Sequence, residues 1–255
     1  MKKLRLSIII ILAAMACYSG YRLIDYGIKI YKADKADEAM LEYRPVIPTP
    51  NPASENDEGT TLPMTEADDN NRSLFEPILK MQQVNPDFIG WLNVYDTNID
   101  FAFAQSTDND YYLYKDINRE YSISGTVFLD YRCNSDFTSQ VSVLYGHHMK
   151  KSSKFTYMDA FDNIEYLITH RHLNILLKDR YIQSKIFAYA IVPYDSREAF
   201  NALNDAEMLY QYLKDNARIY IDPGYEPGDR LIVLATCNYE YSNARAILVA
   251  CVKSV

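Results

Sequence analysis

Short apolar runs separated by polar turn residues occupy most of the chain after about residue 88. The runs have strand length and are bounded by turn-forming residues such as Asp96-Thr97-Asn98 and Lys178-Asp179-Arg180. The predicted strands are Phe88–Val94, Ile99–Ala104, Ser124–Leu129, Val141–Tyr145, Leu173–Leu177, Tyr181–Val192, Leu231–Thr236 and Ala246–Val252. Many short strands with few long helices predict a mostly β (α+β) domain, built as an antiparallel sandwich or a closed barrel.

Helical spacing replaces the strand pattern in two places within this domain. Leu74–Val84 predicts a short helix that ends at Asn85-Pro86-Asp87. Apolar residues recur at helical spacing between Ser196 and Asn216, with Ser196 as an N-cap. This segment predicts one helix, or two helices broken near Asn204-Asp205, inserted before the strand Leu231–Thr236.

The N-terminus carries an uncharged apolar stretch from Leu6 to Tyr21, preceded by three basic residues. The stretch reaches about 24 Å as a helix, which is short for a bilayer core, and Leu23 and Ile24 extend it. An uncleaved signal-anchor is the favoured interpretation, with the basic end in the cytoplasm. Cleavage at Ala14-Met15-Ala16 and a lipoprotein site at Cys17 are the alternatives. Each alternative exports the rest of the chain.

A proline-rich and acidic stretch separates this N-terminal segment from the predicted domain. Residues 26–43 have helical spacing with mixed charge, and the following thirty or so residues are rich in Pro, Asp and Glu. We therefore divide the chain into a membrane anchor (1–25), a juxtamembrane helix with a solvated spacer (26–73) and a catalytic domain (74–255).

Composition excludes some classes of function. A formal net charge of −8 without a cluster of Lys or Arg argues against a nucleic-acid binder. The four cysteines show no C-x-x-C spacing, and the sequence contains no phosphate loop or metal-ligand spacing, so we expect no cofactor and no metal. Small buried side chains are the favoured interpretation of Cys133 and Cys251, and a disulfide between them is the alternative.

Three residue types suited to acyl transfer stand at strand ends. Cys237 follows the strand Leu231–Thr236, Arg245 precedes the next strand, and His147 follows Val141–Tyr145 and Gly146. A histidine can activate a thiol and return its proton to a leaving amine. An arginine stays charged and can hold a tetrahedral oxyanion. The neighbouring His148 is the alternative base, but His147 is favoured because it directly follows Gly146.

The flanking motifs resemble the sortases, and among them class B. The family signature T-L-x-T-C is matched by Val233-Leu234-Ala235-Thr236-Cys237, with the family arginine at Arg245 and the family histidine in Gly146-His147. Further motifs that resemble class B are Asn85–Leu92 (NPDFIGWL), Ser124-Gly125-Thr126, Leu129-Asp130-Tyr131-Arg132 and Gly228-Asp229. Val233 replaces the first Thr of the signature, and Asn238 stands where many relatives have Asp, which puts a role for an acid there in question.

The resemblance implies a closed eight-stranded β-barrel with an N-terminal helix and an inserted helix that walls the substrate groove. It also implies a membrane-anchored, cell-surface cysteine transpeptidase of a Gram-positive type of cell. Such an enzyme cleaves a C-terminal sorting signal after Thr and holds the protein as a thioester on Cys237, with His147 as acid and base and Arg245 as oxyanion clamp. The acceptor amine belongs to a peptidoglycan precursor or to a pilin lysine. The expected substrate-binding residues are Thr236, Ala235, Asn238, Tyr239 and Tyr241.

Two other functions compete with this interpretation. A papain-like cell-wall cysteine hydrolase uses the same residue types, but such hydrolases place Cys before His in the chain, and here His147 comes first. A non-enzymatic surface-binding module would account for the 23 tyrosines and predicts a buried Cys237. The chain is expected to act as a monomer.

Overall fold

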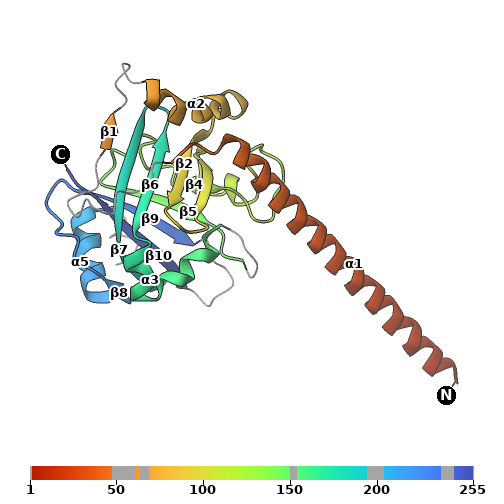
Figure 1. The fold of residues 1–255 in the computed structure, drawn as a ribbon. Coiled ribbons are helices and arrows are strands. Elements are labelled where there is room, and N and C mark those ends of the chain that lie inside the picture. Colours follow the sequence, from red (N-terminus) through yellow and green to blue (C-terminus); the bar gives the residue numbers. More distant parts are fainter. Residues whose placement is uncertain are drawn as a thin grey trace.

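The fold is a single β-sheet closed into a barrel, with helices attached to its outside (Figure 1). The structure is a computed structural model and describes residues 2–47, 61–63, 69–149, 154–193, 204–236 and 244–254. The strands are β1 (Thr61–Pro63), β2 (Phe88–Val94), β3 (Asp100–Ala104), β4 (Val127–Leu129), β5 (Val141–Gly146), β6 (His172–Leu177), β7 (Arg180–Pro193), β8 (Ile219–Tyr220), β9 (Arg230–Thr236) and β10 (Ala244–Val252).

Eight of these strands form the closed ring. Their order is β7-β10-β9-β5-β4-β3-β2-β6, and β6 pairs with β7 to close the barrel. The pairs β3–β4 and β5–β9 are parallel, and the other neighbours in the ring are antiparallel. Closure leaves the ring without open edges, because every strand has two partners. The closed eight-stranded barrel expected from the sequence is confirmed, and each ring strand overlaps one of the predicted strands.

Alternation of side chains along the strands separates two hydrophobic clusters. All eight ring strands contribute to one cluster, which therefore fills the barrel interior and includes Leu144, Leu234 and Leu248. The other cluster contains alternate residues of the same strands, such as Tyr145 and Ala235, together with residues of the surrounding helices. It lies on the outer face of the barrel. A residue's position along its strand thus determines whether its side chain points inward or outward.

The helices cover the outside of the barrel and one of its ends. Helix α2 (Asp69–Val84) and helix α5 (Ala206–Asn216) pack into the outer cluster. The 3-10 helix η3 (Phe155–Phe161) and helix α3 (Ile164–Thr169) contribute Phe155, Met158, Phe161 and Leu167 to the interior cluster. Asp205 caps α5 by accepting a hydrogen bond from the Met208 N–H. The predicted helix is therefore found from Ala206 onward, while its predicted N-cap, Ser196, lies outside the described residues.

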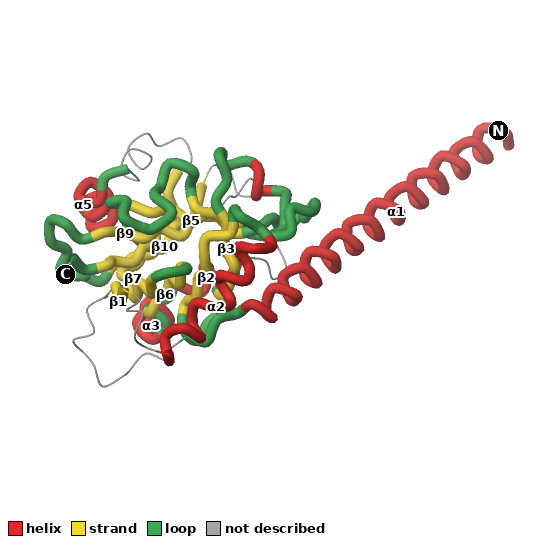
Figure 2. Tube along the Cα trace, turned by 90° about the horizontal axis from the view of Figure 1, so that it is seen from above, coloured by secondary structure: helices red, strands yellow, loops and turns green. Residues whose placement is uncertain are grey.

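A single long helix, α1 (Lys2–Met40), replaces the two N-terminal segments predicted from the sequence. The N-terminal part of α1 extends away from the barrel (Figure 2), and the C-terminal end of α1 packs against the barrel. Ala33 and Met40 are buried, and after the short helix η1 (Leu41–Tyr43), Arg44 pairs with Asp100 of β3 at 2.5 Å. Of the described residues, only α1 is long and apolar enough to cross a membrane.

Part of the predicted spacer joins the barrel. Thr61–Pro63 pair with Arg180–Ile182 of β7 as a short antiparallel strand, and α2 begins at Asp69. The chain thus contacts the barrel both before the proline-rich stretch, through α1, and within it, through β1. Two- and three-residue strands such as β8 and β1 give no period-2 signal, which explains why the pattern did not predict them.

We expect glycine at position 90 to be required for the close pairing of β2 with β6. A Cβ at Gly90 would lie 2.1 Å from the carbonyl oxygen of Leu176. We expect Gly90→Ala to lower the free energy of unfolding by about 1–3 kcal/mol, the usual cost of overpacking. Thermal unfolding of the full chain in detergent micelles measures this. Gly27→Ala is the matched control, because nothing lies within 4 Å of a Cβ there. An unchanged midpoint for Gly90→Ala would contradict the close approach.

Candidate functional site

The site is organised by the parallel pairing of β5 with β9. The register runs from Val141 opposite Leu231 to Gly146 opposite Thr236. Because the strands are parallel, Gly146 and Thr236 stand at the same end of the sheet. His147 is the first residue after β5. Cys237, which follows Thr236 in the sequence, lies outside the described residues, as do Asn238, Tyr239 and Tyr241.

His147 is held by its Nε2 atom. This nitrogen lies 2.7 Å from the carbonyl oxygen of Leu113, and the ring centroid of Tyr114 lies 6.0 Å from that of His147. A carbonyl oxygen can only accept a hydrogen bond, so Nε2 carries the hydrogen. In the neutral imidazole, Nδ1 is then the nitrogen able to take a proton. The structure therefore fixes which nitrogen of neutral His147 carries the hydrogen.

The Leu113 carbonyl is itself held by close packing and a buried polar network. Gly125 (φ +58°) approaches so closely that a Cβ there would lie 2.4 Å from the Leu113 oxygen. The preceding Tyr112 donates its hydroxyl to Asp87 at 2.9 Å and accepts from Asn85 Nδ2 at 3.0 Å. Burial raises the pKa of Tyr112 to about 12, so it remains a donor. Two of the class B-like motifs noted in the sequence, Asn85–Leu92 and Ser124-Gly125-Thr126, thus meet behind His147.

His148 points to a different partner. Its Nε2 lies 2.7 Å from the Asp159 carboxylate in η3. The backbone of His147 is tied to the same region, because the Phe155 N–H donates to the His147 carbonyl at 3.0 Å. The Phe155 ring packs where a Cβ on Gly146 would lie, 2.8 Å away. Glycine before His147 is therefore a packing requirement, and the two histidines have separate environments.

Arg245 lies on the outer face, beside β5. It is the second residue of β10 and pairs with Val192 of β7. Its guanidinium carbon lies 5.9 Å from the ring centroid of Tyr145, which is a cation–π distance. Tyr145 precedes Gly146 and His147 in the chain. The structure thus places Arg245 against Tyr145, two residues before His147 in the chain.

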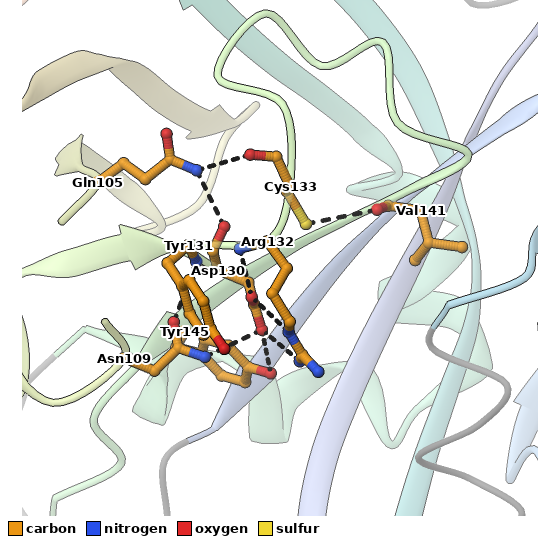
Figure 3. Close-up of polar contacts among 8 residues, drawn as sticks. All are labelled: Gln105, Asn109, Asp130, Tyr131, Arg132, Cys133, Val141 and Tyr145. Carbon is orange, nitrogen blue, oxygen red and sulfur yellow. Dashed lines mark hydrogen bonds and ion pairs between the residues drawn. The ribbon is translucent and has the colours of Figure 1, made fainter. Parts of the chain in front are cut away.

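Asp130 holds the hydroxyl group of Tyr145 in place (Figure 3). The Tyr145 hydroxyl donates to the Asp130 carboxylate at 3.2 Å, and Arg132 donates through Nε at 2.9 Å and through a terminal nitrogen at 2.7 Å. Asn109 Nδ2 donates at 3.0 Å. Burial acts to raise the pKa of Asp130, but these hydrogen bonds, led by Arg132, outweigh it and the pKa is lowered. The sequence singled out Asp130 only as part of a motif.

Two predicted substrate-binding residues are buried. The Thr236 hydroxyl accepts from the Ala246 N–H at 3.0 Å, and Ala235 belongs to the outer cluster with 1% of its surface exposed. Thr236 therefore ties β9 to β10 next to Arg245. Direct contact of either side chain with substrate stays a prediction.

The two described thiols of the barrel domain, Cys133 and Cys251, are poor nucleophiles. Cys133 and Cys251 are both free, so they form no disulfide with each other. Burial raises the pKa of Cys133, and it raises the pKa of Cys251 to about 12. Within the described ranges, no group of three or more His, Cys, Asp or Glu could hold a metal ion.

A cavity opens on the outer face of β5, next to the Asp130 cluster. Its volume is about 340 Å³, and its lining includes Asp130, Arg132, Val141, Val143 and Asn204. Val141 and Val143 share the outward orientation of Tyr145, so the cavity follows the strand that leads to His147. Asn204 stands two residues before α5. The expected role of the inserted helix as a groove wall stays a prediction.

Comparison with known proteins places this barrel among the sortases. No protein-family model matches the chain. The chain is 27% identical over 247 residues to sortase B of Listeria monocytogenes, a match that covers 95% of this chain and 94% of that protein. A class B sortase of Streptococcus pyogenes has a TM-score of 0.64 and 27% identity, over 68% of this chain and 96% of that one. Sortase B of Bacillus anthracis shares the fold, with a TM-score of 0.67 and 22% identity, over 89% and 99% of the two chains.

The fold and the sequence matches together support assignment of this chain to the sortases, which are cysteine transpeptidases. The similar proteins are class B sortases, which supports a class B assignment.

The hydrogen-bond partners of the histidines predict opposite tautomers in one molecule. Neutral His147 should carry its hydrogen on Nε2, facing the Leu113 carbonyl. His170 should carry its hydrogen on Nδ1, which lies 2.9 Å from the Tyr166 carbonyl. Long-range proton–nitrogen NMR spectra of the histidine-labelled full chain in micelles measure both, and His147→Gln assigns the signal. An Nδ1–H tautomer at His147 would contradict the geometry.

Asp130 is expected to stabilise the fold in a pH-dependent manner. Its folded-state pKa is lowered, so its contribution is present above the unfolded-state value of about 4 and is lost as the pH falls through the folded-state value. Asp130→Asn should lower the unfolding free energy at pH 7 by about 1–3 kcal/mol, and less in acid. Thermal midpoints of the two proteins between pH 3 and 7 measure this. Exposed Asp215→Asn serves as control. A constant gap across that range would contradict the assignment.

Proposed function

We propose that this chain is a cell-surface sortase that cleaves a C-terminal sorting signal after Thr and holds the cleaved protein as a thioester on Cys237. The observation that carries the proposal is the parallel register that ends with Gly146 opposite Thr236. Paired strands lie about 4.8 Å apart and consecutive Cα atoms about 3.8 Å apart, so two residues that directly follow paired strand ends start close together. Cys237 and His147 are the residues that follow these two ends in the sequence.

The alternation of side chains between the two faces of each strand supports the same set of residues. Tyr145, Ala235 and Ile247 belong to the outer cluster. Arg245 stands two residues before Ile247 and therefore faces the same side of β10. If the alternation of β9 continues by one residue beyond Thr236, the Cys237 side chain leaves on this outer side, beside His147 and Arg245. A nucleophile, a base and an oxyanion clamp would then face one groove.

The proposed reaction has two symmetric halves. The Cys237 thiolate attacks the carbonyl carbon of the signal's Thr, and Arg245 stabilises the oxyanion. The C–N bond then breaks, and the Nδ1 proton of the His147 imidazolium passes to the departing amine, leaving a thioester. An acceptor amine next gives its proton to His147 and attacks the thioester. A new amide forms and the thiolate is released.

The acceptor and the location complete the proposal. The partners are surface proteins or pilins that bear a sorting signal, and the acceptor is the amine of a peptidoglycan precursor or a pilin lysine. The similar Streptococcus pyogenes sortase is described as involved in pilus biogenesis, which supports testing both acceptors. The apolar part of α1 is proposed as a single-pass membrane anchor (1–25), with the catalytic domain (74–255) on the outside.

The test is transfer by the full chain in detergent micelles. LPxTG-like and NPxTN-like peptides are offered with an added amine, and the products are identified by mass spectrometry. Cys237→Ala should abolish cleavage on every peptide, and His147→Ala should slow it by about 10²–10⁴-fold. Arg245→Lys should slow it by about 100-fold, because it loses the forked donor.

Cys133→Ala is the matched control and should behave as the wild type. Equal behaviour of wild type and Cys237→Ala on every peptide would refute the catalytic assignment. Products formed with water but never with the amine would refute transpeptidation. Trapping the acyl-enzyme in cells and sequencing the attached C-terminus would name the substrate.

A further inference from the structure

Two backbone segments hold His147 from opposite directions. The first runs from Tyr112 to Thr126 and presents the Leu113 carbonyl to Nε2. It is closed on itself, since the Thr126 N–H donates to the Tyr112 carbonyl at 3.0 Å. The second is Lys154-Phe155, whose Phe155 N–H donates to the His147 carbonyl. Anything that fixes both segments fixes the position of the imidazole.

The docked end of α1 contacts Lys154 and shares with both segments a small cavity of about 20 Å³. Asp37 and Met40 of α1 line it from one side, and Asp116, Thr126 and Lys154 line it from the other. The helix that leads from the predicted membrane anchor therefore packs over the segments that hold His147.

Asp37 supplies the polar contact at this interface. Its carboxylate accepts a hydrogen bond from Lys154 Nζ, and the side chain of Lys154 is only 4% exposed. The ammonium also lies 5.2 Å from the ring centroid of Phe101. A buried ammonium is costly unless it is paired, and removal of one partner from such a pair leaves an uncompensated charge. Lys154 therefore depends on Asp37 to remain in place.

The backbone at Lys154 is in a sparsely populated conformation. Its φ is +40°, which side-chain-bearing residues adopt at a cost of about 1–3 kcal/mol. Such a conformation persists where surrounding contacts hold it. Loss of the Asp37 contact allows Lys154 to relax and changes the direction in which Phe155 presents its N–H to His147. The effect of Asp37 thus reaches the imidazole through two residues.

We propose that Asp37, on the docked end of α1, is a positioning residue for His147. This rests on the proposed function, because it assigns α1 a role in the reaction attributed to that histidine. Transfer is then fastest when α1 is seated against Lys154, and α1 acts as part of the catalytic domain as well as its connection to the membrane.

The test compares substitutions at Asp37 with one at its neighbour, in the full chain reconstituted in micelles. Asp37→Asn should lower kcat for peptide transfer by about tenfold, within the range that small misplacements of a catalytic group produce, and should leave KM for the sorting peptide unchanged. Asp37→Glu keeps the carboxylate and should recover most of the rate. Glu38→Gln is the matched control, since Glu38 is exposed and its ion pair among the described residues is with Lys35 of the same helix.

A second measurement follows the thiol directly. The rate of Cys237 alkylation against pH reports the thiol–imidazole pair, and its midpoint should shift in Asp37→Asn but not in Glu38→Gln. If wild type and Asp37→Asn agree in both kcat and alkylation profile, the positioning role is wrong while the proposed function stands. An equal loss in Glu38→Gln would also overturn it. An inactive wild type with an unreactive Cys237 would instead refute the proposed function itself.

Discussion

The parallel pairing of β5 with β9 is the constraint on which the site depends. In a barrel whose neighbouring strands were all antiparallel, the carboxyl ends of adjacent strands would lie at opposite rims. Here the register from Val141–Leu231 to Gly146–Thr236 brings two strand ends out together, and the antiparallel β10 returns Arg245 to the same rim. Closure of the ring holds this arrangement from both sides, through β4 on one flank and β7 on the other. The strand topology therefore sets the positions of the candidate site residues, and the side-chain contacts then set their orientations.

Buried polar groups then convert this topology into fixed orientations. The Leu113 carbonyl selects the protonated nitrogen of His147, and Asp130 orients the tyrosine ring beneath Arg245. Both supports are buried, where a polar group without a partner is costly, so each network holds a single arrangement. The histidine and the arginine are thus held by two networks that are joined by β5 and by Gln105, which donates hydrogen bonds to the carbonyl oxygens of Asp130 and Asp87.

The sequence predicted the strands well because each carries apolar residues of strand length between turn residues. It also offered His147 and Arg245 as candidates, because they stand at strand ends. It could not predict what supports them. The acceptor for His147 is a backbone carbonyl, which has no residue signature at Leu113. Gly125 and Asn85 were noted as motif residues, but their purpose depends on a contact with Tyr112 that only the folded chain brings about. The Asp37–Lys154 contact joins residues 117 positions apart, and no local pattern encodes such a pair.

The position of α1 changes how the N-terminal third of the chain is understood. Composition alone suggested a solvated spacer that holds the domain away from the membrane. In the structure, α1 is seated against the barrel at Ala33 and Met40, and Arg44 is paired with Asp100, before the proline-rich stretch begins. Thr61–Pro63 then pair with β7, so both ends of that stretch are attached to one body. A segment tied to the same body at both ends cannot set that body's distance from a membrane. If the apolar part of α1 is the anchor, that distance follows from α1, which at about 1.5 Å per residue is a stiff connection. Its docked end contacts Lys154, the residue before the Phe155 N–H that bonds the His147 carbonyl.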